Sequence, residues 1–339
     1  MINKIYEKIK SFIKDNYKFL LGLLVIFLLF YVELPFVIYT PGGTIDLKNR
    51  IILEDKYESS GKLQMAYVRA VKGTLPFLGL SYLIDDWDIM KKEDITYENE
   101  TIKEKEYKDK INMQASIDNA ILASYRLLGK EIKINKVHNI VTYIDKNADT
   151  DLKLYDEIIS IEGVDVTSLD EYRNEVLKAK ENDILTLKVL RNKKEIEVKI
   201  KVYNTTDGLK TGISMISTYD YTTNPEIDIK SKMSESGPSG GLMMALGIYD
   251  ALVEYDITKG YNIVGTGTID EYGKVGEIGG VKYKLLGAYK QGAEIFICPK
   301  ENYEEVKSIV KQKNYDIIVL TGDSLDEIIE SLKELPEKG

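Results

Sequence analysis

Residues 234–241, Ser-Glu-Ser-Gly-Pro-Ser-Gly-Gly, run directly into an apolar segment. Gly237 and Gly240 permit close backbone approach and unusual dihedral angles, and Pro238 fixes the entry to a helix. The unpaired N–H groups at the N-terminus of such a helix can hold an oxyanion, so Ser239 at this place can act as a nucleophile. A serine N-cap on an ordinary core helix is the alternative interpretation.

A nucleophilic serine needs a base, and the chain contains a single histidine, His138. A Ser-His-Asp triad would have to use that residue, so a Ser–Lys dyad is the remaining arrangement for an activated serine. Burial in a dry pocket lowers the pKa of a lysine towards the range of a general base. Downstream, residues 265–284 predict a strand, a polar turn and a Gly-Gly junction that leads into a lysine-bearing helix.

Three motifs carry a family resemblance: Gly-Pro-Ser-Gly-Gly, then Thr-Gly-Thr-Ile, then Ile-Gly-Gly-Val-Lys-Tyr-Lys. Together they resemble the proteolytic domain of the Lon family of Ser–Lys peptidases. The resemblance implies that Ser239 is the nucleophile and Lys284 the general base. It also implies that Thr266 steadies that lysine, and that the turn formed by Gly237, Pro238 and Gly240 holds the oxyanion.

Lys282 competes with Lys284 for the role of the base. On a helix that starts near Val281, Lys284 shares a face with Val281 and other apolar residues, so its stem would be buried. Lys282 points about 200° away, since two residues separate the lysines. The helical geometry therefore favours Lys284.

The chain departs from the Lon pattern at three points. Ser236 stands where an acidic residue is usual, and Gly240 where alanine usually follows the nucleophile. The sequence also has no Gly-x4-Gly-Lys-Ser/Thr phosphate loop, which predicts an ATP-independent enzyme. Without an unfoldase, substrates must arrive unfolded or offer flexible segments.

The N-terminal residues predict a membrane anchor. Residues 2–13 place apolar side chains at helical spacing between lysines, typical of a helix at a membrane surface. Residues 19–32 carry no charge but span only about 21 Å, short of a hydrocarbon core of about 30 Å. Interfacial anchoring by Tyr17, Lys18 and Tyr31 can close part of the gap, and residues 34–39 add apolar length although Pro35 disrupts a regular helix. A signal peptide is the alternative, but no cleavage site follows. The excess of lysine in 1–18 predicts a cytoplasmic N-terminus and an extracellular catalytic domain.

The rest of the chain divides into three parts. The first and the last carry strands and helices that resemble a Lon proteolytic domain. The middle part contains Leu-x-Asp-x-Ile-x-x-Ile-x-Gly and resembles a bacterial PDZ domain, although it has no clear glycine-rich carboxylate loop. Within the first part, residues 90–110 are predicted to be a solvated charged stretch and residues 113–128 a helix.

The expected fold is α+β (α/β-like), with the PDZ domain inserted in the Lon-type domain. The predicted boundaries are 1–18 for the basic tail, 19–39 for the transmembrane helix, 40–134 for the first Lon-like part, 135–203 for the PDZ-like domain and 204–339 for the second Lon-like part with the dyad.

Composition narrows the functional classes. The net charge of -9, despite a basic N-terminus, argues against nucleic-acid binding. Cys298 is the only cysteine, which excludes an intramolecular disulfide, and its setting predicts a buried strand end. With one histidine and one distant cysteine, neither a transition-metal site nor another cofactor is expected. His138 is predicted to be a surface or packed residue.

Taken together, the three parts resemble the membrane-anchored, PDZ-containing Lon-like peptidases of Gram-positive bacteria, the YlbL/SepM type. The expected function is site-specific cleavage of extracytoplasmic peptides or small membrane or secreted proteins by a serine endopeptidase. The resemblance also implies a homo-oligomeric ring. The alternative is a membrane-tethered PDZ scaffold that binds peptides and carries an inactive peptidase-like domain.

Overall fold

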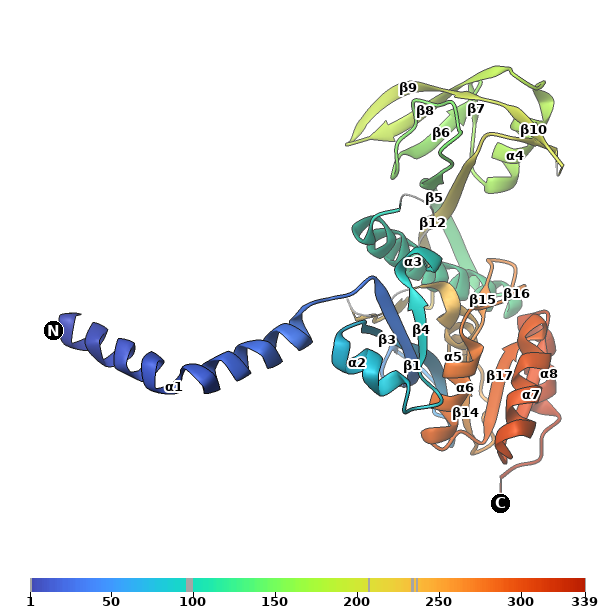
Figure 1. Ribbon diagram of the computed structural model, residues 1–339. Helices are drawn as coiled ribbons and strands as arrows, with labels where there is room; N and C mark the ends of the chain where they lie inside the picture. The colour runs from blue at the N-terminus through green and yellow to red at the C-terminus, as the bar shows by residue number, and fades with distance from the viewer. Residues whose placement is uncertain (1, 96–99, 207, 233–234, 236, 339) are drawn as a thin grey trace.

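The computed structural model describes residues 2–95, 100–206, 208–232, 235 and 237–338, and its main body is built on a mixed six-stranded sheet (Figure 1). The strands lie in the order β18 (Ile318–Gly322), β17 (Ile295–Pro299), β14 (Asn262–Gly265), β3 (Lys62–Lys72), β1 (Phe36–Asp46) and β4 (Asp88–Lys91). β1 is antiparallel to both of its neighbours, whereas β3, β14, β17 and β18 are mutually parallel. The sheet therefore joins strands from the two ends of the chain.

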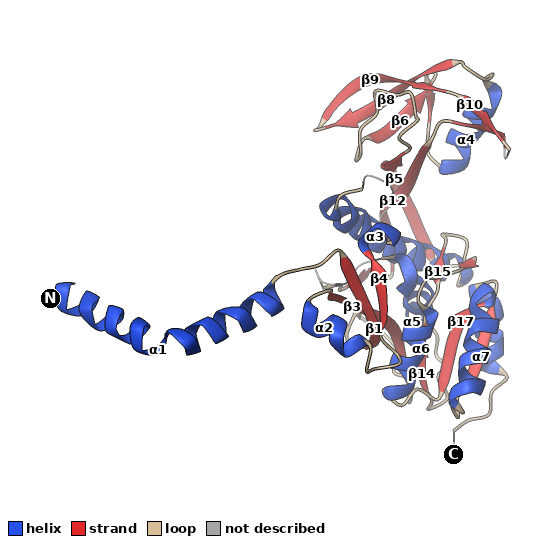
Figure 2. Ribbon diagram, in the orientation of Figure 1, coloured by secondary structure: helices blue, strands red, loops and turns tan. Residues whose placement is uncertain are grey.

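Helices cover both faces of this sheet, as Figure 2 shows. On one face lie α6 (Val281–Lys290) and α7 (Tyr303–Lys313); on the other lie α3 (Ile102–Leu127), α5 (Gly241–Leu252) and α8 (Leu325–Lys333). Strand β17 shows why two layers form. Its side chains alternate, so Ile295 and Ile297 pack with α5 while Phe296 and Cys298 pack with α6.

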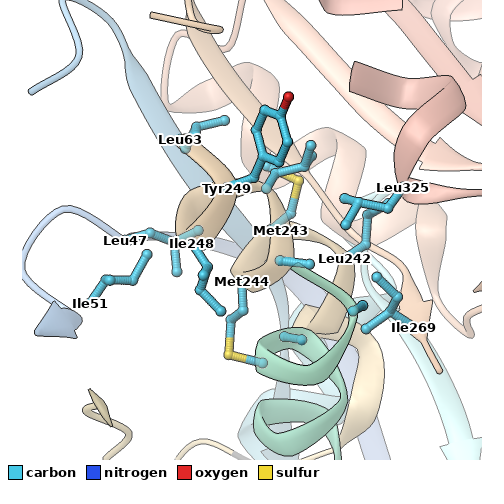
Figure 3. Close-up of a cluster of buried hydrophobic side chains, with 14 of the residues drawn as sticks. Leu47, Ile51, Leu63, Leu242, Met243, Met244, Ile248, Tyr249, Ile269 and Leu325 are labelled. Atoms are coloured by element: carbon cyan, nitrogen blue, oxygen red, sulfur yellow. The ribbon is translucent and has the colours of Figure 1, made fainter. Parts of the chain in front are cut away.

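Helix α5 is the centre of the larger core (Figure 3). All of its residues are buried, in agreement with a sequence that is apolar on every side. Leu47 and Ile51 pack on it from the first part of the chain, and Ile269 and Leu325 from the last part. Two short strand pairings surround this core: β2 (Ile51–Leu53) with β13 (Ile227–Ile229), and β15 (Thr268–Ile269) with β16 (Val275–Gly276). The short helix η3 (Lys300–Asn302) precedes α7.

A second unit has its own sheet and its own core. Its strand order is β12 (Ile213–Asn224), β5 (Glu131–Ile144), β6 (Glu157–Ile161), β8 (Ile184–Arg191) and β9 (Lys194–Lys201), with β7 (Val164–Asp165) paired to β6. Helix α4 (Leu169–Lys178) closes the core through Tyr172 and Val176, and a small hairpin pairs β10 (Tyr203–Thr205) with β11 (Gly208–Lys210). The long strands β5 and β12 continue out of this unit as a ribbon that reaches the main body (Figure 1).

Helix α3 begins well before residue 113, the predicted start of the helix, so the second half of the charged stretch 90–110 is helical. Thr101 and Glu104 form a capping box, in which each side chain accepts the other residue's backbone N–H. Within the first turns, Lys105 pairs with Asp109 four residues later. The stretch before it forms β4 and the short helix η1 (Lys92–Asp94).

The transmembrane helix predicted over residues 19–39 is not present. Helix α1 (Ile2–Tyr31) departs from helical geometry at Asn16 and ends at Tyr31, and the next apolar residues belong to strand β1, where Ile38 lies in the core. The charge-free part of α1, residues 19–31, is about 20 Å long, against about 30 Å for a hydrocarbon core. Across the described ranges, no helix combines the length and the apolar character that crossing a membrane requires.

Candidate active site

Ser239 lies in the short helix η2 (Pro238–Gly240), which leads directly into α5. Gly237 precedes it with a φ of 89°, a backbone conformation that favours glycine. Two contacts from α3 hold this turn: the Gly237 N–H donates to the Asp109 carbonyl at 3.1 Å, and the Ser116 hydroxyl donates to the Pro238 carbonyl at 2.9 Å. Both contacts hold residues directly before the half-buried Ser239 and so fix its position.

Thr266 follows β14 at the carboxyl end of the parallel strands, where sites of α/β proteins usually lie. Its N–H donates to the Ile297 carbonyl of the neighbouring strand at 3.0 Å. Its hydroxyl donates to the backbone carbonyl of Ser239 at 2.9 Å, and the Gly267 N–H donates to the same carbonyl at 2.8 Å. Thr266 thus attaches the serine turn to the end of the sheet.

Lys284 approaches from the other helical layer. It lies on α6 and is only 4% exposed. Its Nζ donates to Thr266 Oγ1 at 3.1 Å, so one hydroxyl connects the lysine with the serine turn. Burial lowers the pKa of Lys284 from 10.5 to about 8, because a low-dielectric surrounding disfavours the charged amine. A substantial fraction of a lysine with this pKa is neutral near physiological pH.

A close backbone approach fixes the position of α6. Gly287, one turn after Lys284, packs on the irregular part of β1, where a Cβ on Gly287 would lie 3.0 Å from the carbonyl of Gly42. Gly280 adopts a left-handed conformation (φ 68°) at the start of the helix. The helix can approach the strand this closely because position 287 has no side chain.

Lys282 occupies a different environment. Its Nζ forms an ion pair with Asp88 at 2.5 Å, and its side chain is 33% exposed. The Tyr283 hydroxyl donates to the same carboxylate at 2.6 Å. The two lysines therefore differ in the way that helical spacing predicts: one is buried against Thr266, and the other is partly exposed and paired.

Thr266→Val is expected to lower the free energy of unfolding by about 1–3 kcal/mol, because the buried Lys284 amine loses its acceptor and the Ser239 carbonyl loses a donor. Chemical denaturation would measure the change. Thr266→Ser keeps the hydroxyl and is the matched control, with at least half of the loss expected to be restored. Equal stability of the valine and serine variants would contradict this role for the hydroxyl.

The turn residues have more specific roles than the sequence predicts. The Gly237 N–H is donated to Asp109, and Pro238 has no N–H, so neither provides an oxyanion donor and both act through the shape of the turn. At Gly240 a Cβ would lie 2.9 Å from Met65 Sδ, so alanine at the position after Ser239 would require a shift of that flexible side chain. Ser236, the departure from the acidic position, lies outside the described residues.

An ion pair that the motifs do not reveal holds the segment before Ser239. Arg50 makes two contacts with the carboxylate of Glu235, at 2.5 and 3.1 Å, and donates to the Lys230 carbonyl. Both side chains are largely buried. Glu235 also lines a pocket of about 290 Å³ against α3. The other lining residues are Lys110, Met113, Gln114, Ile117, Ser231 and Lys232.

Cys298 and His138 are not among the residues that connect Ser239, Thr266 and Lys284. Cys298 is fully buried in β17, as predicted, and burial raises the pKa of its thiol to about 12. His138 lies on β5 between two carboxylates, with Nδ1 3.0 Å from Glu157 and Nε2 3.1 Å from Asp220. Among the described residues, no group of three or more His, Cys, Asp or Glu side chains is arranged to hold a metal ion.

Comparison with known proteins agrees with this architecture. Residues 225–334 match the Lon protease (S16) C-terminal proteolytic domain, and residues 119–202 match the PDZ domain. The Lon protease of Clostridioides difficile (strain 630) is 34% identical over 157 residues, which are 42% of this chain and 19% of that protein. Lon protease 1 of Bacillus subtilis (strain 168) is 32% identical over 96 residues, 28% of this chain and 12% of that protein.

These relatives are much longer than the matched region, and the chain spans a fifth or less of their length. The Lon protease of Mesomycoplasma hyopneumoniae (strain 232) is 36% identical over 94 residues, again 28% of this chain and 11% of the relative. The matched segment contains Ser239, Thr266 and Lys284. The chain thus combines a Lon-type proteolytic domain and a PDZ domain in one mixed α+β fold, and this combination is similar to that of the PDZ-containing Lon-like peptidases.

Proposed function

We propose that the chain is a serine endopeptidase of the Lon type, in which Ser239 is the nucleophile and Lys284 the general base. The observation that carries the proposal is the buried Lys284 amine with a pKa of about 8, hydrogen-bonded to the Thr266 hydroxyl that also holds the Ser239 turn. A depressed amine pKa near the operating pH is what general-base catalysis by lysine requires. The partly exposed, ion-paired Lys282 lacks that property.

In the proposed mechanism, neutral Lys284 accepts the hydroxyl proton of Ser239 as the oxygen attacks a peptide carbonyl. The first-turn N–H groups of the helix that begins at Pro238, together with its dipole, stabilise the developing oxyanion. Lys284, now protonated, donates its proton to the leaving amine. A water molecule then attacks the acyl-enzyme, with Lys284 again as the base, and releases the carboxylate product and free Ser239. Thr266 orients the lysine throughout.

We further propose that the PDZ domain is inserted in one peptidase domain, whose first part is residues 40–134. The shared sheet supports this, because β14 lies between β3 and β17. Strands β5 and β12 then connect the two domains, and the Tyr219 N–H of β12 donates to Asp118 of α3. A peptide bound by the PDZ domain would lie close to the element that fixes the serine turn.

ATP-independent cleavage of unfolded or flexible peptides, and assembly into a ring, are part of the same proposal and rest on the sequence. We also propose that α1 attaches the protein to a membrane. The support is that apolar side chains of α1 are exposed along its length and lie beside lysines in its first half. The extracellular location of the catalytic domain stays a prediction.

The decisive experiment incubates the purified full-length chain, without ATP, with an unfolded polypeptide such as reduced casein. Cleavage is monitored by mass spectrometry of the products. We expect defined new termini with the wild type and at least about a 10³-fold lower rate with Ser239→Ala. Ser231→Ala, a serine in the exposed segment before the turn, is the matched control and should cleave normally. Equal products from wild type and Ser239→Ala would overturn the proposal and favour the PDZ scaffold.

A further inference from the structure

Helix α2 (Leu75–Ser81) and the turn after it expose an unusual number of large apolar side chains. None of the helix residues is buried. Tyr82 and Leu83 in the turn are 82% and 80% exposed, and Leu75 and Leu80 are also exposed. We call these four residues the α2 patch. Such a concentration of exposed apolar side chains indicates an interaction surface.

The α2 patch is continuous with the end of α1. The ring of Phe30, in the last turns of α1, packs edge-on against Phe77 of α2, with their centres 6.4 Å apart. Phe77 in turn packs against Trp87, also at 6.4 Å. Figure 1 shows α2 on the side of the body from which α1 projects. One apolar surface therefore extends from α1 over α2 to Trp87.

The exposed surface of α1 indicates what covers this region. Residues 19–31 are apolar on every side of the helix, and their large side chains are exposed all round it. A second protein copy would cover one stripe of such a helix, whereas lipid can surround it. Tyr31, Tyr82 and Trp87 add the aromatic side chains that are enriched at the boundary between headgroups and acyl chains.

We propose that the α2 patch inserts into the headgroup region of a phospholipid bilayer as a second contact beside α1. The proposal rests on membrane attachment through α1. Two contacts fix an orientation where a single helix would leave the body free to rotate. The strand after the patch, β4, carries Asp88, which binds Lys282 and Tyr283 of α6. The membrane contact is thus linked by one strand to the helix that carries Lys284, which favours polypeptides at the membrane surface as substrates.

Trp87 makes the proposal directly testable, because it is the only tryptophan in the chain. The full-length protein is mixed with vesicles of phosphatidylcholine and phosphatidylglycerol whose acyl chains carry bromine near the headgroups. We expect quenching and a blue shift of Trp87 fluorescence. The double substitution Tyr82→Ser with Leu83→Ser should raise the lipid concentration needed for half-maximal quenching about tenfold. Ile184→Ser, at an exposed position of the PDZ domain (61%), is the matched control and should bind as the wild type does.

Each contrary outcome has a distinct meaning. Protein that floats with vesicles while Trp87 fluorescence is unchanged overturns the α2 contact but leaves the attachment through α1. Protein that does not float overturns both membrane proposals. A change in sedimentation of the double variant without lipid, with no quenching of the wild type, shows that a second copy covers the patch instead. Cleavage of casein by the same protein preparations in detergent tests the peptidase proposal independently of these three outcomes.

Discussion

Lys284→Met is expected to abolish peptide hydrolysis and at the same time to stabilise the fold. The loss of activity should reach about 10³-fold or more, because Lys284 is the lysine whose amine contacts Thr266 in the described part of the chain. The gain in stability follows from the burial of Lys284, which is 4% exposed. Methionine fills a similar volume without a charge, so the substituted side chain removes the cost of burying an ammonium group.

The size and the pH dependence of this gain follow from the pKa. Burial lowers the pKa of Lys284 from 10.5 to about 8, so the unfolded chain binds more protons than the folded chain between these values. The free energy of unfolding of the wild type therefore rises with pH from about 8 to about 10.5. Below pH 8 the full penalty of about 3 kcal/mol applies, and Lys284→Met should remove most of it. Above pH 10.5 the two proteins should be equally stable.

Lys282→Met is the matched control, since it removes the neighbouring lysine of the same helix. Its ion pair with Asp88 is partly exposed, so we expect a change in stability below about 1 kcal/mol and retained hydrolysis. Urea denaturation at pH 7 and at high pH, with casein cleavage on the same preparations, provides both measurements. If Lys282→Met were inactive and Lys284→Met active, the base would be Lys282 instead of Lys284.

Elements with a regular apolar period could be predicted from the sequence. A helix starts at Val281, as expected from the Gly-Gly junction before it, and the apolar segment after Ser239 forms the buried helix α5. A Gly-Gly pair precedes or opens each of them. The unbroken apolar run of β17 is likewise typical of a strand that is buried on both faces.

The two main errors have physical causes. The start of α3 is polar and has no apolar period, and its signal is the capping box between Thr101 and Glu104, which could have been found in the sequence. At the N-terminus, the apolar run contains two elements instead of one: α1 ends at Tyr31, and Phe36 begins a core strand. Hydropathy alone does not distinguish a membrane segment from a helix followed by a buried strand.

The candidate site, too, could be predicted from the sequence only in part. Local motifs single out Ser239, Thr266 and Lys284, and the structure brings the three close together through the Thr266 hydroxyl. The contacts that hold the turn come from Arg50 and from α3, which are far away in the sequence. Such partners depend on the sheet order that joins the two ends of the chain, and no local pattern encodes that order.

Hydrolysis is expected to increase steeply with pH, with a midpoint near the pKa of Lys284, about 8. Only the neutral amine can accept the Ser239 proton, and the neutral fraction is about 1% at pH 6 and about 90% at pH 9. The value of kcat/KM should therefore fall roughly 100-fold between pH 9 and pH 6, while circular dichroism shows an unchanged fold. A flat profile over this range would contradict a lysine base.

Thr266→Val is expected to shift the pH midpoint of hydrolysis, and a merely structural role of Thr266 does not predict such a shift. The Lys284 amine donates to Thr266 Oγ1, and a hydrogen bond to the charged form of an amine favours that form. Removing the acceptor should lower the pKa of Lys284 further and move the midpoint of the residual activity to lower pH, whereas Thr266→Ser should keep the midpoint of the wild type. The direction of the shift is decisive, because loss of stability alone would reduce the rate at every pH without moving the midpoint. An unmoved midpoint in Thr266→Val would mean that Thr266 holds the Ser239 turn but does not act on the base.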